Sequence, residues 1–117
     1  MTELKTLTEL NSNAELRQEV IDQLNKDFGS NVPDFEWDDS VVDPFSAFVT
    51  SFEHFLKVWL REHEQKLMQI LYRVDLFERK VKFVWSYDAD ERPRRLAFMI
   101  LDRELQKVLT RRLNKQK

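Results

Sequence analysis

The chain contains two histidines, the side chains that most often carry protons or bind metals. His63 is followed by Glu64, as in the zinc proteases, but the second histidine of that motif would stand at position 67, where Leu67 is found. His54 directly follows Glu53, so the Glu-x-x-His spacing of di-iron bundles is absent as well. We therefore expect both histidines on the surface of a helix or at the edge of a core, and not as metal ligands.

Carboxylates alternate in an acidic stretch at Asp34, Glu36 and Asp38, a pattern that has something in common with a calcium loop. An EF-hand loop starting at Asp34 requires glycine at its sixth position and glutamate at its twelfth, but Asp39 and Phe45 stand there. We expect no calcium site. The stretch is interpreted instead as a solvated loop whose aromatic residues dock on the core.

The scarcity of glycine and the absence of cysteine exclude several other catalytic motifs. The chain has one glycine and no cysteine, which excludes Gly-rich phosphate loops, thiolate zinc sites and a cysteine nucleophile. The serines at positions 40, 46, 51 and 86 lack the glycines of a nucleophile elbow. The sequence thus predicts no catalytic, cofactor or metal site, and we do not expect an enzyme.

Cations recur at every fourth residue near the C-terminus, at Arg103, Lys107, Arg111 and Lys115. On a helix they form a ridge, predicted to lie opposite the apolar face, that could contact successive phosphates. Asp102 and Glu104 dilute this ridge, and the helix dipole favours cations at a helix C-terminus in any case. The ridge is a candidate site for nucleic acid or another anionic surface, and its alternative interpretation is a solvated helix face.

Aromatic residues give the strongest pattern in the chain, with successive spacings of 3, 4, 3 and 4 at Phe45, Phe48, Phe52, Phe55 and Trp59. The pattern predicts one long helix over residues 44–73 whose apolar face touches more than one neighbour. We expect these side chains in the core. Nine Phe and three Trp are a heavy load for one small core, so part of the set is a candidate dimer seam or partner groove.

Three further helices are predicted around this one. A capping box at Ser12 and Glu15 opens a helix over 13–28, and Gly29 ends it. Residues 76–86 fit helix and strand spacing about equally, and we favour a helix, opened by Asp75, because a lone strand has nothing to pair with. The last helix covers 91–114. Asp43 and Pro44 supply the start of the 44–73 helix.

These elements predict an all-α fold in a single domain over residues 1–117. The length suits one core, and a single glycine leaves few tight turns for a sheet. We expect a small antiparallel bundle of three to four helices with the 44–73 helix in the centre. Residues 1–12 are expected to be flexible, and residues 30–43 to form an acidic connecting loop.

Charge divides the chain into two halves. Residues 1–64 hold 14 acids and 5 bases, whereas residues 65–117 hold 7 acids and 14 bases. These halves are expected to face each other within one domain or across a head-to-tail dimer. No signal peptide and no apolar run of about 20 residues is found, so we expect a cytoplasmic protein without a membrane partner.

The sequence favours a non-enzymatic interaction module that binds a protein partner or a second copy of itself, as a homo-oligomer. The alternative is a nucleic-acid or anionic-surface binder that uses the basic C-terminal helix.

Overall fold

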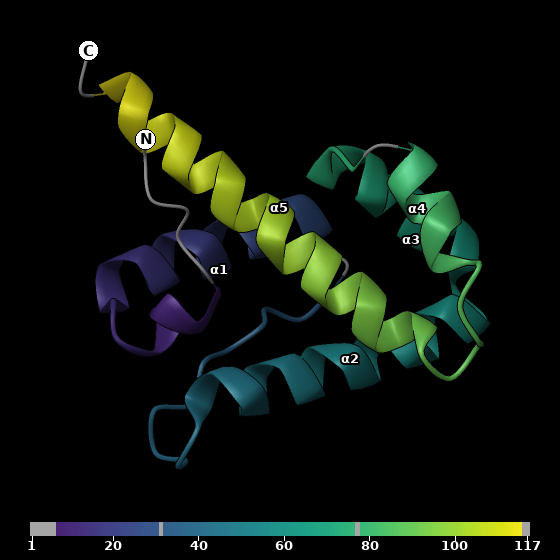
Figure 1. The fold of residues 1–117 in the computed structure, drawn as a ribbon, viewed down its shortest axis with the longest axis horizontal. Helices are drawn as coiled ribbons and strands as arrows, with labels where there is room; N and C mark the ends of the chain where they lie inside the picture. The colour runs from purple at the N-terminus through teal and green to yellow at the C-terminus, as the bar shows by residue number, and fades with distance from the viewer. Residues whose placement is uncertain (1–6, 31, 77, 116–117) are drawn as a thin grey trace.

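The computed structural model describes residues 7–30, 32–76 and 78–115 (Figure 1). These residues form a 3-10 helix and five α-helices, without any strand: η1 (Leu7–Asn11), α1 (Ala14–Phe28), α2 (Pro44–Glu62), α3 (Glu64–Val74), α4 (Glu78–Val84) and α5 (Arg92–Lys115). The predicted all-α class is confirmed. The bundle of three to four helices is not confirmed. Two helices, α2 and α3, stand where one helix over residues 44–73 was expected, so the described residues form five α-helices.

The N-terminal part of the fold begins with η1, inside the segment expected to be flexible, and Leu10 of η1 is buried. Residues 1–6 lie outside the described residues. Helix α1 is capped by Asn13, whose side-chain oxygen accepts a hydrogen bond from the Leu16 N–H at 3.0 Å. The predicted Ser12 cap was therefore wrong by one residue. Gly29 ends α1 with a positive φ of 84°, as predicted.

Helix α2 starts where the sequence indicated, with the Asp43 carboxylate accepting a hydrogen bond from the Ser46 N–H and Pro44 as the first helical residue. It ends earlier than predicted. His63 leaves the helical region, at φ −139° and ψ 42°, and α3 begins at the next residue. The bend turns α3 so that it packs on α1 as well as on α2. No proline or glycine marks this break, so the sequence offered no signal for it.

The second break was predicted at the right place but with the wrong role for Asp75. This residue ends α3 in the left-handed region, at φ 71°, and its N–H contacts the carbonyl oxygens of Leu71 and Tyr72. Its side chain accepts a hydrogen bond from Arg103 of α5 at 2.8 Å. The segment that fitted both helix and strand is helical at α4, as expected.

Helix α5 occupies the centre of the fold, because it packs on each of the other helices (Figure 1). It runs in the opposite sense to α2: Arg94 pairs with Glu53, and one turn later Phe98 packs near Phe45. The predicted central position of the 44–73 helix is therefore wrong. The aromatic stripe was strong, but a helix in contact with all others needs apolar residues spread more widely around it.

The five stripe aromatics lie on the core side of α2, as predicted. Phe45, Phe48 and Phe52 are buried, while Phe55 and Trp59 are half-buried and pack against the core. The acidic loop docks on the same cluster through its own aromatics Phe35 and Trp37, which confirms that expectation. Within the described ranges, no helix has the length and apolar character needed to cross a bilayer.

Candidate functional site

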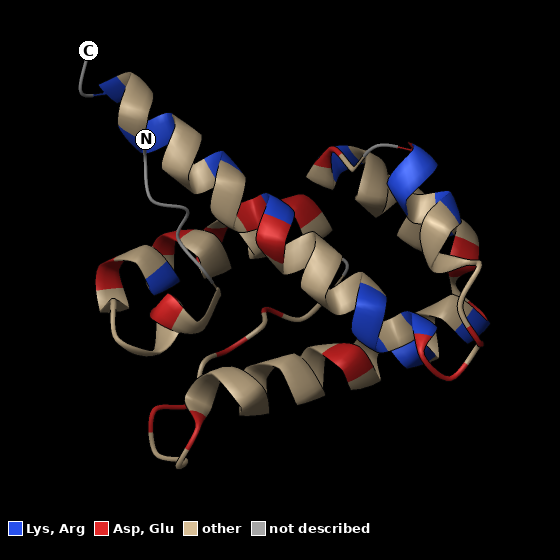
Figure 2. Cartoon of the chain, in the orientation of Figure 1, with Lys and Arg blue, Asp and Glu red and all other residues tan. Residues whose placement is uncertain are grey.

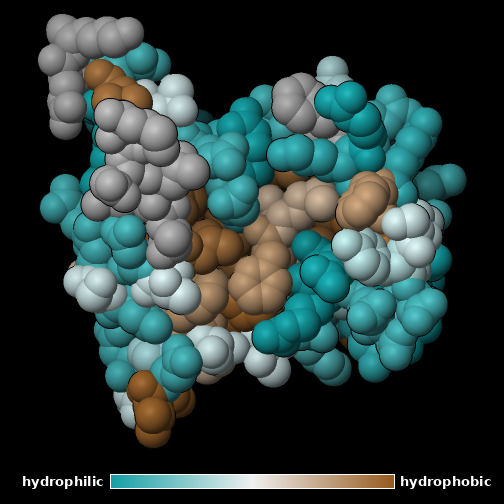
Figure 3. Space-filling model, in the orientation of Figure 1, coloured by the Kyte–Doolittle hydropathy of each residue, from teal (hydrophilic) through white to brown (hydrophobic). Residues whose placement is uncertain are grey.

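An open apolar groove lies between α4 and α5, with a volume of about 710 Å³. Its apolar lining consists of Leu7, Phe83, Val84, Tyr87, Phe98 and Met99. Figure 3 shows a hydrophobic strip of side chains over these two helices, with hydrophilic ones beside it. Charged residues border the strip at Arg79, Lys80, Arg95 and Asp102.

Helix α4 exposes an aromatic ring because it is short and packs through one side only. Val84 is fully buried against the core, whereas the preceding Phe83 is 60% exposed. Successive residues on a helix point about 100° apart, so burial of one turns the other outward. Phe83 meets Tyr87 edge to face, with ring centroids 5.5 Å apart. The two rings form a wall of the groove.

The groove carries excess positive charge at its border. The Arg95 guanidinium lies 4.5 Å from the centroid of the Tyr87 ring, in a cation–π contact. Within the described part of the chain, no carboxylate forms an ion pair with Arg79, Lys80 or Arg95. Three cations against the single carboxylate of Asp102 leave the border positive.

The spacing of apolar residues between positions 81 and 87 also indicates the exposed wall of this groove. Val81, Phe83, Trp85 and Tyr87 alternate as in a strand. In a short helix, such alternation places apolar residues on more sides than the core can bury, and one of them must remain at the surface. The spacing that fits both a helix and a strand therefore also indicates that an aromatic side chain of this segment is exposed.

The four predicted ridge cations Arg103, Lys107, Arg111 and Lys115 line one shallow pocket on α5, of about 410 Å³. Most of them have partners within the chain. Arg103 pairs with Asp75 at 2.8 Å, and Arg111 donates a hydrogen bond to the Gln23 side-chain oxygen at 2.9 Å. Lys107 is only 20% exposed at its side chain, so the ridge does not lie opposite the apolar face as expected.

Lys107 contacts two buried carboxyl groups, Asp27 and Glu104. Its Nζ lies 3.0 Å from Glu104 Oε1, but neither oxygen of Glu104 has a well-directed hydrogen-bond donor in the described part of the chain. Burial, then the neighbouring Asp27, raises the pKa of Glu104 to about 8. Burial disfavours the charged form of Lys107, but its hydrogen bond to Asp27 and the nearby negative charge of Glu104 and Asp27 outweigh burial and raise the pKa of Lys107.

Glu104 was interpreted as a surface residue that diluted the ridge, and this was wrong. It follows Ile100 by four residues and precedes Val108 by four, so helical spacing places it on the buried face. Its charge masked a position that periodicity alone would have assigned to the core.

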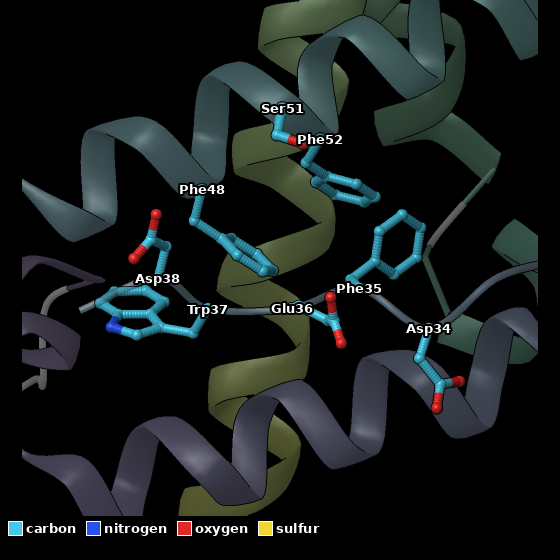
Figure 4. A pocket seen from close by; sticks show the side chains of 8 residues that line it. All are labelled: Asp34, Phe35, Glu36, Trp37, Asp38, Phe48, Ser51 and Phe52. Carbon is cyan, nitrogen blue, oxygen red and sulfur yellow. The ribbon is translucent and has the colours of Figure 1, made fainter. Parts of the chain in front are cut away.

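A third hollow, of about 630 Å³, lies between the acidic loop and α2. Figure 4 shows the rings of Trp37 and Phe48 side by side, with the carboxylates of Asp34 and Glu36 directed away from them. Among the described residues, no group of three or more His, Asp or Glu side chains is placed to hold a metal ion. The alternating acids of this loop do not converge.

The two histidines do not approach each other either. His54 is exposed on α2, and His63 packs its ring on Trp59 at the α2–α3 bend, with centroids 4.8 Å apart.

Comparison with known proteins adds no relative to this description. A scan against protein-family models found no match, and neither a search of the curated proteins nor one of the solved structures found any. We therefore infer the function from the chain's own geometry.

Proposed function

We propose that the protein is a non-enzymatic interaction module, and that its α4–α5 groove binds an apolar, acidic segment of a protein. The observation that carries the proposal is the exposed aromatic wall: Phe83 is 60% exposed beside Tyr87, above an apolar floor. Hydrophobic patches of this kind, bordered by polar residues, mark protein interaction sites. Aromatic residues and methionine are enriched at such sites.

The border supports an acidic partner. Arg79, Lys80 and Arg95 have no carboxylate partner among the described residues. A partner with aspartates or glutamates beside its apolar residues would neutralise these cations, whereas a basic partner would be repelled. The apolar floor would supply most of the affinity, and the border would select the charge and raise the association rate.

The anionic-surface alternative receives less support from the same arrangement. Arg103, Lys107 and Arg111 would have to leave Asp75, Asp27 and Gln23 before contacting phosphates. Phosphate binding also predicts a steep loss of affinity with salt. Binding of mixed DNA or RNA that is lost on Lys107→Glu with Arg111→Glu would favour this alternative.

A pair of short peptides tests the proposed function. In one, paired valines are flanked by aspartates, and in the other, lysines replace the aspartates. Fluorescence anisotropy of labelled peptide should report binding of the acidic peptide alone. Phe83→Ala should weaken it about ten-fold or more, as expected for an aromatic anchor.

Tyr72→Ala is the matched control, because Tyr72 is 87% exposed but lies on α3, away from the groove. It should bind as the wild type does. Equal binding of both peptides, or an unchanged affinity of Phe83→Ala for the acidic peptide, would contradict the proposal.

A further inference from the structure

The loop between α1 and α2 presents two unpartnered apolar side chains. Val42 is fully exposed and Val41 is 37% exposed. In Figure 3, hydrophobic colour marks the tip at the lower left, where Figure 1 places this loop. In Figure 1 the loop precedes α2 at the end of that helix that lies away from α4.

Acidic residues flank the two valines and hold the loop in shape. Asp38 accepts hydrogen bonds from the N–H and hydroxyl of Ser40, and Asp43 accepts them from Ser46 at the start of α2. Asp39 accepts one from the Trp37 indole. A loop fixed in this way loses little conformational entropy when it binds.

Hydrogen bonds favour the charged form of two carboxylates of the loop, Asp38 and Asp43. Hydrogen bonds from Ser40 lower the pKa of Asp38, and those from Ser46 lower the pKa of Asp43. Asp39 has a cationic neighbour, Arg17, at 3.6 Å. Neither Asp38 nor Asp43 has an ion-pair partner in the part of the chain that the structure describes.

Two ion pairs join α1 and α5 within one copy. Lys107 pairs with Asp27, and Arg112 pairs with Glu19. Unpaired charge remains at several places on the surface, and at two of them it adjoins exposed apolar side chains: acidic at the 38–43 loop and basic at the border of the groove. Figure 2 shows them at opposite sides of the molecule, red at the loop and blue at α4.

We propose that the occupant of the α4–α5 groove is the 38–43 loop of a second copy of this chain. This inference rests on the proposed function. Val41 and Val42 would contact the wall of Phe83 and Tyr87, with the flanking aspartates near Arg79, Lys80 and Arg95. Loop and groove are different surfaces, so the pairing is head to tail. A head-to-tail contact of this kind repeats from copy to copy and builds a ring or a chain.

Such a contact is small compared with a standard interface of roughly 1,600 Å². We expect a dissociation constant between about 1 μM and 1 mM. Dilution of the ¹⁵N-labelled full chain should shift two sets of amide resonances, those of residues 38–43 and those around the groove. Sedimentation equilibrium should show species above the 14.2 kDa monomer.

Two variants with exposed substitutions provide a mixing test. Val42→Lys removes the loop contact and keeps the groove, and Phe83→Ala does the reverse. Each alone should associate about ten-fold more weakly or not at all. An equimolar mixture still offers one intact contact and should recover association, with the labelled Val42→Lys partner shifting at its groove. Tyr72→Ala should associate as the wild type does, and circular dichroism should show equal helix content in all variants.

The outcomes separate this inference from the proposed function. A single 14.2 kDa species up to about 1 mM, without dilution shifts, overturns self-association while the acidic peptide can still bind. Self-association that Phe83→Ala removes but Val42→Lys leaves intact overturns the loop as occupant. Failure of the acidic peptide to bind, together with a monomer, overturns both.

Discussion

Glu104 carries its carboxyl group in the core, where neutral and charged forms differ most in free energy. Its pKa is raised from 4.5 to about 8 in the folded chain, first by burial and then by Asp27. Between these values the folded state binds the proton that the unfolded state has released. Stability contributed by the neutral acid is therefore fully present below about pH 4.5 and is lost as the pH rises to about 8.

Replacement by glutamine keeps the shape and removes the titration. We expect Glu104→Gln to abolish the part of the stability decrease between pH 5 and 8 that belongs to this residue, which is at most a few kcal/mol at about 1.4 kcal/mol per pKa unit. Urea denaturation at a series of pH values measures it. Glu36→Gln, at an exposed site without an ion-pair partner among the described residues, is the control and should leave the profile of stability against pH almost unchanged. Parallel profiles for wild type and Glu104→Gln would contradict the assignment.

Two phenylalanines, Phe52 and Phe83, should respond very differently to truncation. Phe52 is buried among the rings of Phe28 and Phe35, so Phe52→Ala should cost ~3–5 kcal/mol of unfolding free energy. Phe83 stands at the surface, and Phe83→Ala should cost less than about 1 kcal/mol. Chemical denaturation compares them. Similar losses for the two would mean that Phe83 belongs to the core and not to a binding surface.

At the scale of elements, α1 ends through a backbone conformation that only glycine adopts easily. Gly29 has φ 84° and ψ 178°. A methyl group there meets no obstacle, since the nearest atom is the Arg73 side chain at 3.7 Å. Gly29→Ala should therefore destabilise the fold by backbone strain alone, by about 1–3 kcal/mol.

Thermal denaturation followed by circular dichroism measures this cost. The neighbouring Ser30→Ala, at an exposed site, should change the midpoint very little. An unchanged midpoint for Gly29→Ala as well would show that the end of α1 is not held in this conformation.

The ends of a helix could be predicted from the sequence where a capping or helix-ending residue marks them. Asp43 and Pro44 mark the start of α2, and Gly29 marks the end of α1. The break at His63 has no such signal, because it arises when two apolar stripes turn toward different neighbours. The central position of α5 is likewise a property of the packed fold, and local periodicity does not report it.

The candidate site was less predictable than the helices. The stripe on α2 drew attention to the aromatics that are in fact core residues, whereas the exposed Phe83 lay in the segment with ambiguous spacing. The basic ridge followed the helical period, but its partners Asp27 and Asp75 are distant in sequence. Only the folded chain determines which charges are matched and which remain for a partner.

At the scale of the whole molecule, the distribution of charge and the exposed apolar surface support the same proposed function. Acidic and basic residues pair between α1 and α5, and three further cations, Arg79, Lys80 and Arg95, border an apolar groove. This arrangement is the basis for proposing an interaction module with selectivity for acidic, apolar segments.

The most direct test of that account is a titration of the ¹⁵N-labelled protein with the peptide that carries paired valines between aspartates. We predict that the largest saturating shifts fall on residues 79–87 of α4 and the turn after it, and on residues 95–102 of α5. Shifts confined to the ridge around Arg103–Lys115, or to the hollow around Trp37 and Phe48, would contradict the groove as the binding site, and so would the absence of any shift at millimolar peptide.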